Sequence, residues 1–131
     1  MWLLRIKMID IRHQHRINII KYLFALSFHE GLPTDTEKDM TLHNILKNNK
    51  EIEEIIAKYA PRYPIEKISK LDLAILKLSV YELIFEKKNP PKVIIDEAVE
   101  LAKEYGNDRS YSFINGVLGT VFKDLDKKND K

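Results

Sequence analysis

One segment of the chain is apolar on almost every side when it is wound as a helix. It spans residues 70–85, with the sequence KLDLAILKLSVYELIF. The polar side chains Asp72, Ser79 and Glu82, with Glu86 just after the segment, gather on a stripe roughly 80° wide. A helix with so wide an apolar surface is stable only when other helices enclose it. We therefore expect a central, enclosed helix here, with Lys77 as its anomaly because it lies outside the polar stripe.

Apolar residues elsewhere recur at helical rather than strand spacing, and this pattern predicts an all-α fold. The expected helices are one after Asp10 with apolar residues from Ile17 to Phe28, one or two within residues 42–59, the central helix, one after Pro91, and a last one capped by Asn107 or Asp108. A chain of 131 residues suits one compact domain. We predict a single domain over residues 1–131, with residues 1–8 and 126–131 disordered.

The helix boundaries rest on short-range signals. Asp10 is a suitable N-cap for the first helix, and Gly106 suits a left-handed helix end. Gly116 and Gly119 lie inside the last helix, where each costs roughly 1 kcal/mol against alanine. We expect a neighbouring helix to approach closely at these two glycines.

Composition excludes several classes of function. The chain has no cysteine, so disulfides, thiolate metal sites and cysteine nucleophiles are excluded. The apolar opening is interrupted by Arg5 and Lys7 and is far shorter than the ~20 residues of a membrane span, so we expect a cytoplasmic protein without membrane contact. Net charge is +2, yet residues 1–29 hold five basic residues against one acidic residue. Such asymmetry favours an arm that binds a polyanion, although a basic helix face is also ordinary solvated surface.

Catalytic and metal sites are not indicated. His13 and His15 form an H-x-H pair, but on a helix residues i and i+2 point in nearly opposite directions and cannot share one ion. The carboxylates of residues 96–104 lie on the outer side of an amphipathic helix, where a solvated face is the better interpretation than a catalytic pair. No nucleophile, phosphate-loop or zinc-protease motif occurs. We predict a protein that is not an enzyme and needs no cofactor or metal.

Two residues admit two interpretations each. The stem of Lys77 can pack on apolar neighbours while its ammonium reaches water, or the ammonium can contact phosphate. Phe113 is either a core residue or a platform on which an unpaired base stacks.

The C-terminal half closely resembles the NusB family. The family pattern of an aspartate followed by AILR-like and YEL residues is similar to Asp72–Leu83, its P-x-K-V-x-I-N-E-A-V-x-L-A-K segment to Pro91–Lys103, and its S-x-x-F-V-N-G-V-L segment to Ser110–Leu118. Upstream, RHQHRINIIKYLFAL is similar to the arginine-rich first helix of the family.

The resemblance implies two small packed helical bundles and a transcription antitermination factor. Such a factor binds boxA-type RNA with the NusE ribosomal protein and joins an RNA polymerase antitermination complex on ribosomal RNA operons. Some relatives self-associate, and the sequence leaves homo-oligomers open. The implied RNA contacts, to which we add the nearby Arg109, are Arg12, His13, Arg16, Lys77, Arg109 and Phe113.

Departures from the family pattern keep alternatives open. Lys77 replaces an arginine and loses its bidentate fork. The segment between Leu26 and Leu42 is short, which predicts an abridged N-terminal bundle. One alternative is therefore a NusB-like interaction module with weak or no RNA binding. Another is a fragment of a ribosomal RNA cytosine methyltransferase, although this chain has no room for its catalytic domain.

Overall fold

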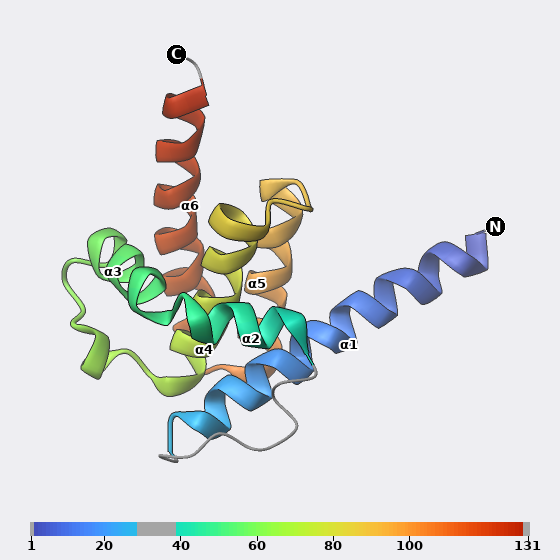
Figure 1. The fold of residues 1–131 in the computed structure, drawn as a ribbon, viewed down its shortest axis with the longest axis horizontal. Coiled ribbons are helices and arrows are strands. Elements are labelled where there is room, and N and C mark those ends of the chain that lie inside the picture. Colours follow the sequence, from blue (N-terminus) through green and yellow to red (C-terminus); the bar gives the residue numbers. More distant parts are fainter. Residues whose placement is uncertain (1, 29–38, 130–131) are drawn as a thin grey trace.

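The computed structural model describes residues 2–28 and 39–129, and its regular elements are all helical (Figure 1). The α-helices are α1 (Trp2–Leu26), α2 (Met40–Lys47), α3 (Asn49–Tyr59), α4 (Lys70–Val80), α5 (Pro91–Tyr105) and α6 (Ser110–Asn129). Two short elements are the 3₁₀ turn η2 (Ile65–Lys67) and the π-helical segment η3 (Tyr81–Glu86). Neither described range contains a strand, which confirms the all-α prediction.

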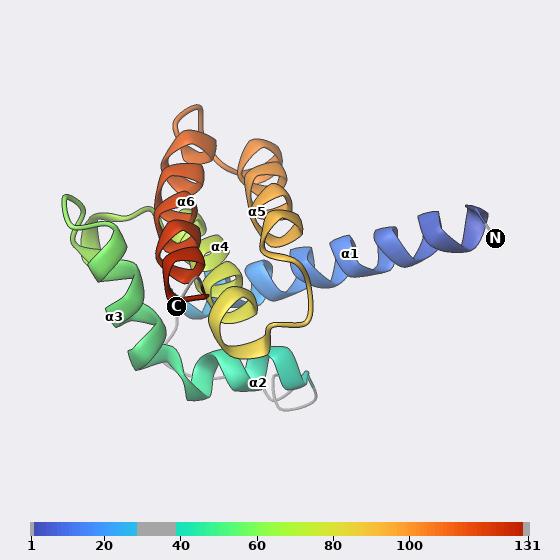
Figure 2. The same ribbon diagram turned by 90° about the horizontal axis from the view of Figure 1, so that it is seen from above.

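Helix α4 is the centre of the fold, as its apolar sequence predicts. It begins after Ser69, whose hydroxyl accepts a hydrogen bond from the Asp72 backbone N–H at 3.1 Å. It then contacts α1, α3, α5 and α6, and Figure 2 shows it lying among them. Because neighbours cover so much of its surface, the polar residues Asp72 and Ser79 are buried along with the apolar ones, as is Glu82 in the adjoining η3.

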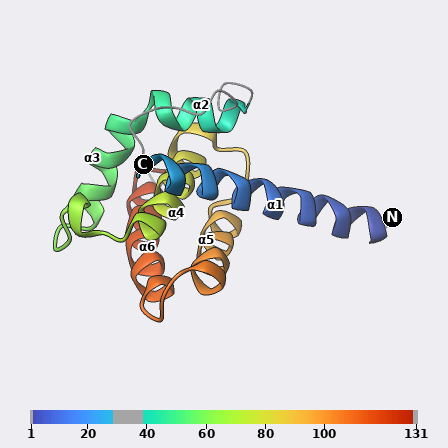
Figure 3. The ribbon, with the colours of Figure 1, turned by 90° about the horizontal axis from the view of Figure 1, so that it is seen from below.

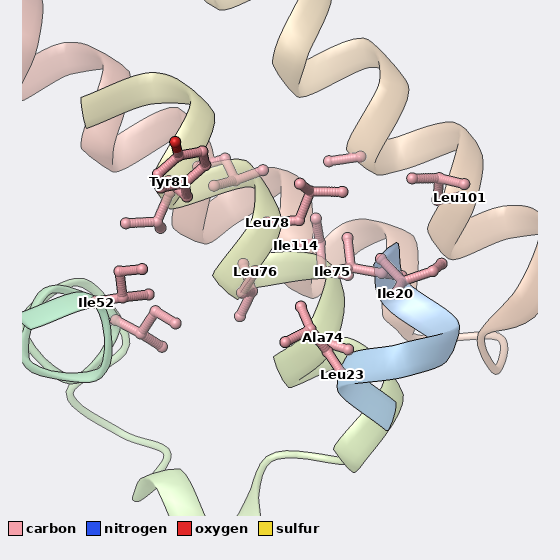
Figure 4. Close-up of a cluster of buried hydrophobic side chains, with 14 of the residues drawn as sticks. Ile20, Leu23, Ile52, Ala74, Ile75, Leu76, Leu78, Tyr81, Leu101 and Ile114 are labelled. Atoms are coloured by element: carbon pink, nitrogen blue, oxygen red, sulfur yellow. The ribbon is translucent and has the colours of Figure 1, made fainter. Parts of the chain in front are cut away.

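A single hydrophobic core joins the N-terminal helices α1–α3 to the C-terminal helices α4–α6. In Figure 4, Ile20 of α1 lies beside Ile75 of α4 and Leu23 of α1 beside Ala74, while Ile52 of α3 lies on the opposite side of α4. Leu101 of α5 and Ile114 of α6 are also buried in this core. Of the two predicted helical bundles, the N-terminal helices α1 and α3 and the C-terminal helices α5 and α6 thus all pack against α4. The connection for which the sequence predicts an abridgement lies mostly outside the described residues.

The first helix is longer than predicted. It begins at Trp2, so Asp10 lies inside it and is not its N-cap. Residues 2–9 contain no proline or glycine, and no local signal therefore stops the helix from extending back from Asp10. Figure 3 shows that this part of α1 projects beyond the other helices. At the other terminus α6 is helical to Asn129, within the segment 126–131 that the sequence predicts to be disordered.

The glycine predictions were wrong in their details. Gly106 is extended, with φ −89° and ψ −171°, and the positive φ in the described ranges belongs to Lys87, at 56°. A Cβ on Gly106 would lie 2.5 Å from Ser110 Cβ, so the close approach of that residue requires glycine. At Gly116 and Gly119 an added Cβ would have no neighbour within 4 Å. Among the described residues, no neighbouring helix approaches either glycine closely.

None of the helices in the described part of the chain is both long enough and apolar enough to span a membrane.

Candidate nucleic-acid interface

The N-terminal ends of α4 and α6 border a groove with two aromatic side chains, which we call the aromatic groove. Tyr63 comes from the loop before η2 and Phe113 from the first turn of α6. Their rings pack edge to face with centroids 5.1 Å apart. The groove has a volume of about 280 Å³, and its lining residues are Tyr63, Lys67, Ile68, Ser69, Asp72, Asn107, Arg109 and Phe113.

Two cations border the aromatic groove. Lys67 and Arg109 are exposed and line it from opposite segments of the chain. The Arg109 backbone N–H donates to Asn107 Oδ1 at 2.9 Å, which ties the residue to the turn before α6. Within the described residues no ion pair involves the side chain of either cation. Both charges therefore remain available to an anionic ligand.

The structure separates Arg16 from this surface. Its side chain is only 7% exposed and Glu82 is 8% exposed. Arg16 Nη2 donates to Glu82 Oε1 at 3.0 Å, and Nε lies 3.2 Å from both carboxylate oxygens. Burial raises the pKa of Glu82, whereas the hydrogen bonds and charge of Arg16 lower it. Arg16 thus holds α1 to the end of the central helix.

His13 is likewise engaged with carboxylates. Its Nδ1 lies 2.9 Å from Glu97 Oε2 and its Nε2 lies 3.2 Å from Glu104 Oε2, both on α5. The hydrogen bond to Glu97 raises the pKa of His13 above its ordinary value, partial burial opposes this, and Glu104 adds to the increase. Glu97 also lies 3.8 Å from Arg16 Nη1. His13 and Arg16 therefore form one charged network between α1 and α5.

Lys77 has a partner on α3. Its side chain is 17% exposed, and its Nζ lies 3.1 Å from Glu53 Oε1. The anomalous lysine of the central helix thus packs its stem among the helices and pairs its ammonium at their edge. Of the two interpretations of Lys77, this geometry is closer to the one in which the stem packs on apolar neighbours. The ammonium, however, contacts a carboxylate instead of water.

Arg12 remains exposed, one turn before Arg16. It borders a second cleft of about 490 Å³ between α1, α2 and the turn after η3. Lys88 and His15 also line that cleft, and His15 Nε2 lies 2.9 Å from Asp39 Oδ2. This second cleft is distant from the aromatic groove. Glu82 lines the cleft and Asp72 lines the groove, and ten residues at a rise of 1.5 Å each place them about 15 Å apart along the central helix. The six predicted contacts therefore do not form one cluster.

Tyr63 and Lys67 were not predicted from the sequence as part of a site. Both lie in the corner PRYPIEKISK, and they approach Phe113 only because η2 and the first turn of α6 come together in space. An aromatic residue between two prolines and near a lysine was the available signal. Among the described residues, no group of three or more histidine, aspartate or glutamate side chains is arranged to hold a metal ion.

Comparison with known proteins gives one family. Residues 13–123 match the model of the NusB family. Transcription antitermination protein NusB of Agathobacter rectalis is 38% identical, over 82% of this chain and 95% of that protein. The protein of the same name from Oleidesulfovibrio alaskensis is 44% identical, over 60% of this chain and 51% of that protein. The chain thus aligns with about half the length of the second relative and nearly all of the first.

A solved structure of T. maritima NusB has the same fold. Its TM-score is 0.75 at 31% sequence identity, and the match covers 86% of this chain and 90% of that one.

Proposed function

The chain belongs to the NusB family, and from this premise we propose that it is a transcription antitermination factor that binds boxA-type RNA together with the NusE ribosomal protein. It acts in the cytoplasm, as part of an RNA polymerase antitermination complex on ribosomal RNA operons. Its role is binding and not catalysis. The names of the matched relatives support the functional class.

The aromatic groove is the observation that carries RNA binding. Proteins that bind single-stranded nucleic acid combine aromatic platforms with a basic surface along the backbone. Tyr63 is 52% exposed and offers such a platform beside Phe113. Arg109 and Lys67 supply positive charge at its border. An unpaired base stacks on the exposed ring of Tyr63, which packs edge to face with Phe113, while these cations attract the flanking phosphates.

Arg12 and Lys88 extend the proposed RNA path to the second cleft. His13, Arg16 and Lys77 act indirectly in this proposal, because their charged groups already contact carboxylates on α5, η3 and α3. They hold the helices that carry the RNA-contacting side chains.

The same ion pairs favour a second candidate function. Three of the six predicted RNA contacts are held by carboxylates, which leaves fewer cations for RNA. A protein-interaction module that binds NusE but has weak RNA affinity is therefore the alternative. Salt dependence separates the two candidates, since RNA binding releases counterions and weakens steeply with salt, whereas a mainly apolar protein contact changes little.

The test is fluorescence anisotropy of a labelled boxA-like RNA titrated with this protein, at low and moderate salt, with and without NusE. A scrambled RNA of equal length is the reference. The proposal predicts a preference for boxA, tighter binding with NusE and weaker binding with salt. Absence of RNA binding in the presence of NusE, while the two proteins associate, would support the interaction module instead.

A matched pair of variants locates the binding surface. Tyr63→Ala removes an exposed platform, and the loss of one stacked base is expected to cost ~1–3 kcal/mol of binding free energy. Tyr111 is the control because it is also exposed, at 46%, but does not line the aromatic groove. Equal losses for Tyr63→Ala and Tyr111→Ala would refute the assignment of the groove.

A further inference from the structure

The aromatic groove contains a carboxylate, that of Asp72, although a negative charge repels the phosphates of RNA. Asp72 lines the aromatic groove together with Lys67 and Arg109, yet it is only 7% exposed. Its Oδ1 is buried, and among the described residues this atom has no hydrogen-bond partner. A buried polar oxygen without a partner costs free energy, and such atoms are uncommon in folded proteins.

Helix capping does not account for this oxygen. Ser69 and Asp72 stand at the N-cap and N3 positions of α4, the spacing of a capping box. The first half of the box is present, since Ser69 Oγ accepts from the Asp72 N–H at 3.1 Å. The second half would have the Asp72 carboxylate accept from the Ser69 N–H, but Oδ1 has no such donor. A favourable interaction with the helix dipole needs only a nearby charge, not a side chain buried against a groove.

We propose that Asp72 selects the base that stacks in the aromatic groove, favouring bases that carry an amino group on their Watson–Crick edge. This inference rests on the proposed RNA-binding function. The carboxylate supplies an acceptor, and the exposed ring of Tyr63, which packs edge to face with Phe113, stacks on the base beside it. Oδ1 is buried, so a rotation of the carboxylate about its terminal torsion is needed to bring this oxygen to the base.

Hydrogen-bond chemistry sets the direction of the preference. The N4 amino group of cytosine donates to a carboxylate, which is an established pairing in base recognition. Uracil has a carbonyl oxygen in place of that amino group, and its N3–H lies between two carbonyl oxygens that repel a carboxylate. A good bidentate side-chain contact to a base edge discriminates by roughly five- to hundredfold, and the single amino contact expected here lies at the lower end of that range. Cytosine is therefore favoured over uracil at this position.

The experiment compares C₁₂ with U₁₂ RNA by fluorescence anisotropy at low salt and pH 7.5, using the full chain. The wild type is expected to bind C₁₂ about fivefold or more tightly than U₁₂. Asp72→Asn keeps the shape but adds an amide N–H that can donate to uracil, so its C₁₂ to U₁₂ ratio should fall to within about twofold. Thermal unfolding of the same samples verifies that the variant is folded.

Asp108→Asn is the control for charge. Asp108 is exposed in the turn before α6 and does not line the groove. Removing its charge should strengthen binding of both RNAs alike and leave the ratio between them unchanged. A change in ratio confined to Asp72→Asn therefore reports a contact with the base, whereas a purely structural aspartate would alter stability but not base preference.

The outcomes separate this inference from the proposed function. RNA binding with no preference for C₁₂ in the wild type refutes the inference alone, whatever the variant does. The same is true if a folded Asp72→Asn protein retains the wild-type ratio. If neither C₁₂, U₁₂ nor the boxA-like RNA binds, with NusE present or absent, then the proposed function fails and this inference fails with it.

Discussion

Replacement of Arg16 by methionine should destabilise the fold strongly, although the side chain is a predicted RNA contact. Methionine keeps an apolar stem of similar length, so the main loss is the charge that faces Glu82. Both side chains are less than one-tenth exposed, and removing one partner of a buried ion pair commonly costs about 3–5 kcal/mol. The orphaned carboxylate also has Glu86 and Glu97 as negative neighbours.

Protonation of Glu82 sets the size of this effect. Without Arg16, Glu82 is expected to fold into the core as the neutral acid and must first take up a proton. The free-energy cost of this protonation is about 1.36 kcal/mol for each pH unit above the usual glutamate pKa of 4.5. That cost is about 3.4 kcal/mol at pH 7 and about 1.4 kcal/mol at pH 5.5. The variant should therefore lose about 3 kcal/mol at pH 7 but much less at pH 5.5.

The sign of the pH dependence follows from the direction of the Glu82 pKa shift. Burial raises this pKa in the folded protein, and loss of Arg16 should raise it further. The folded state then binds the proton more tightly than the unfolded state. The contribution of Glu82 to stability is accordingly most favourable below its unfolded pKa and is lost as pH rises through its folded pKa.

Urea unfolding followed by circular dichroism measures the effect. With a typical slope of about 1.5 kcal/mol per molar urea, a loss of 3 kcal/mol lowers the midpoint by about 2 M at pH 7. Arg12→Met is the matched control, because Arg12 lies one turn away on the same helix and is exposed; its effect should stay within about 0.5 kcal/mol. A loss below about 1 kcal/mol for Arg16→Met, or an equal loss at both pH values, would refute the argument.

Three further predictions concern stability and RNA affinity. The pKa of His13 is raised, so its contribution to stability is present below pH 6.5 and lost as pH rises through its folded pKa. In the His13→Gln variant, the free energy of unfolding should therefore depend less on pH between pH 6 and pH 8 than in the wild type. An unchanged pH profile would exclude this contribution of His13. Gly116→Ala should stabilise by about 1 kcal/mol through helix propensity, whereas Gly106→Ala should destabilise because its Cβ meets neighbouring atoms at 2.5 Å; urea midpoints that move the same way would contradict this. Lys77→Met should leave RNA affinity within about twofold, since the ammonium already pairs with Glu53; a loss above tenfold in anisotropy would make Lys77 a direct RNA contact.

Most of the fold could be predicted because its signals are local. Apolar spacing indicated the helices, prolines and polar turns separated them, and the nearly all-apolar segment identified α4 as the enclosed helix. Errors occurred where a local signal had more than one physical cause. Gly106, for example, is required by the approach of Ser110 and not by a left-handed backbone.

The candidate site was less predictable, because it depends on which charges are free. Arg109 and Phe113 do lie together, but their neighbours Tyr63 and Lys67 come from a corner some 50 residues earlier in the chain. In the sequence Asp72 was visible as part of a polar stripe and as the first residue of the family pattern. Its unpartnered oxygen is a property of the packed structure.

The sequence by itself determined the helical class, the central helix and the family resemblance, because periodicity and motif spacing are properties of neighbouring residues. Arg12 and Arg16 illustrate what it could not decide. They stand one helical turn apart with similar surroundings in the sequence, yet one is exposed and the other is buried. The buried one, Arg16, pairs with Glu82, 66 residues away. Only tertiary packing can bring such a carboxylate to one arginine, and the buried Arg16 then links α1 to the end of the central helix.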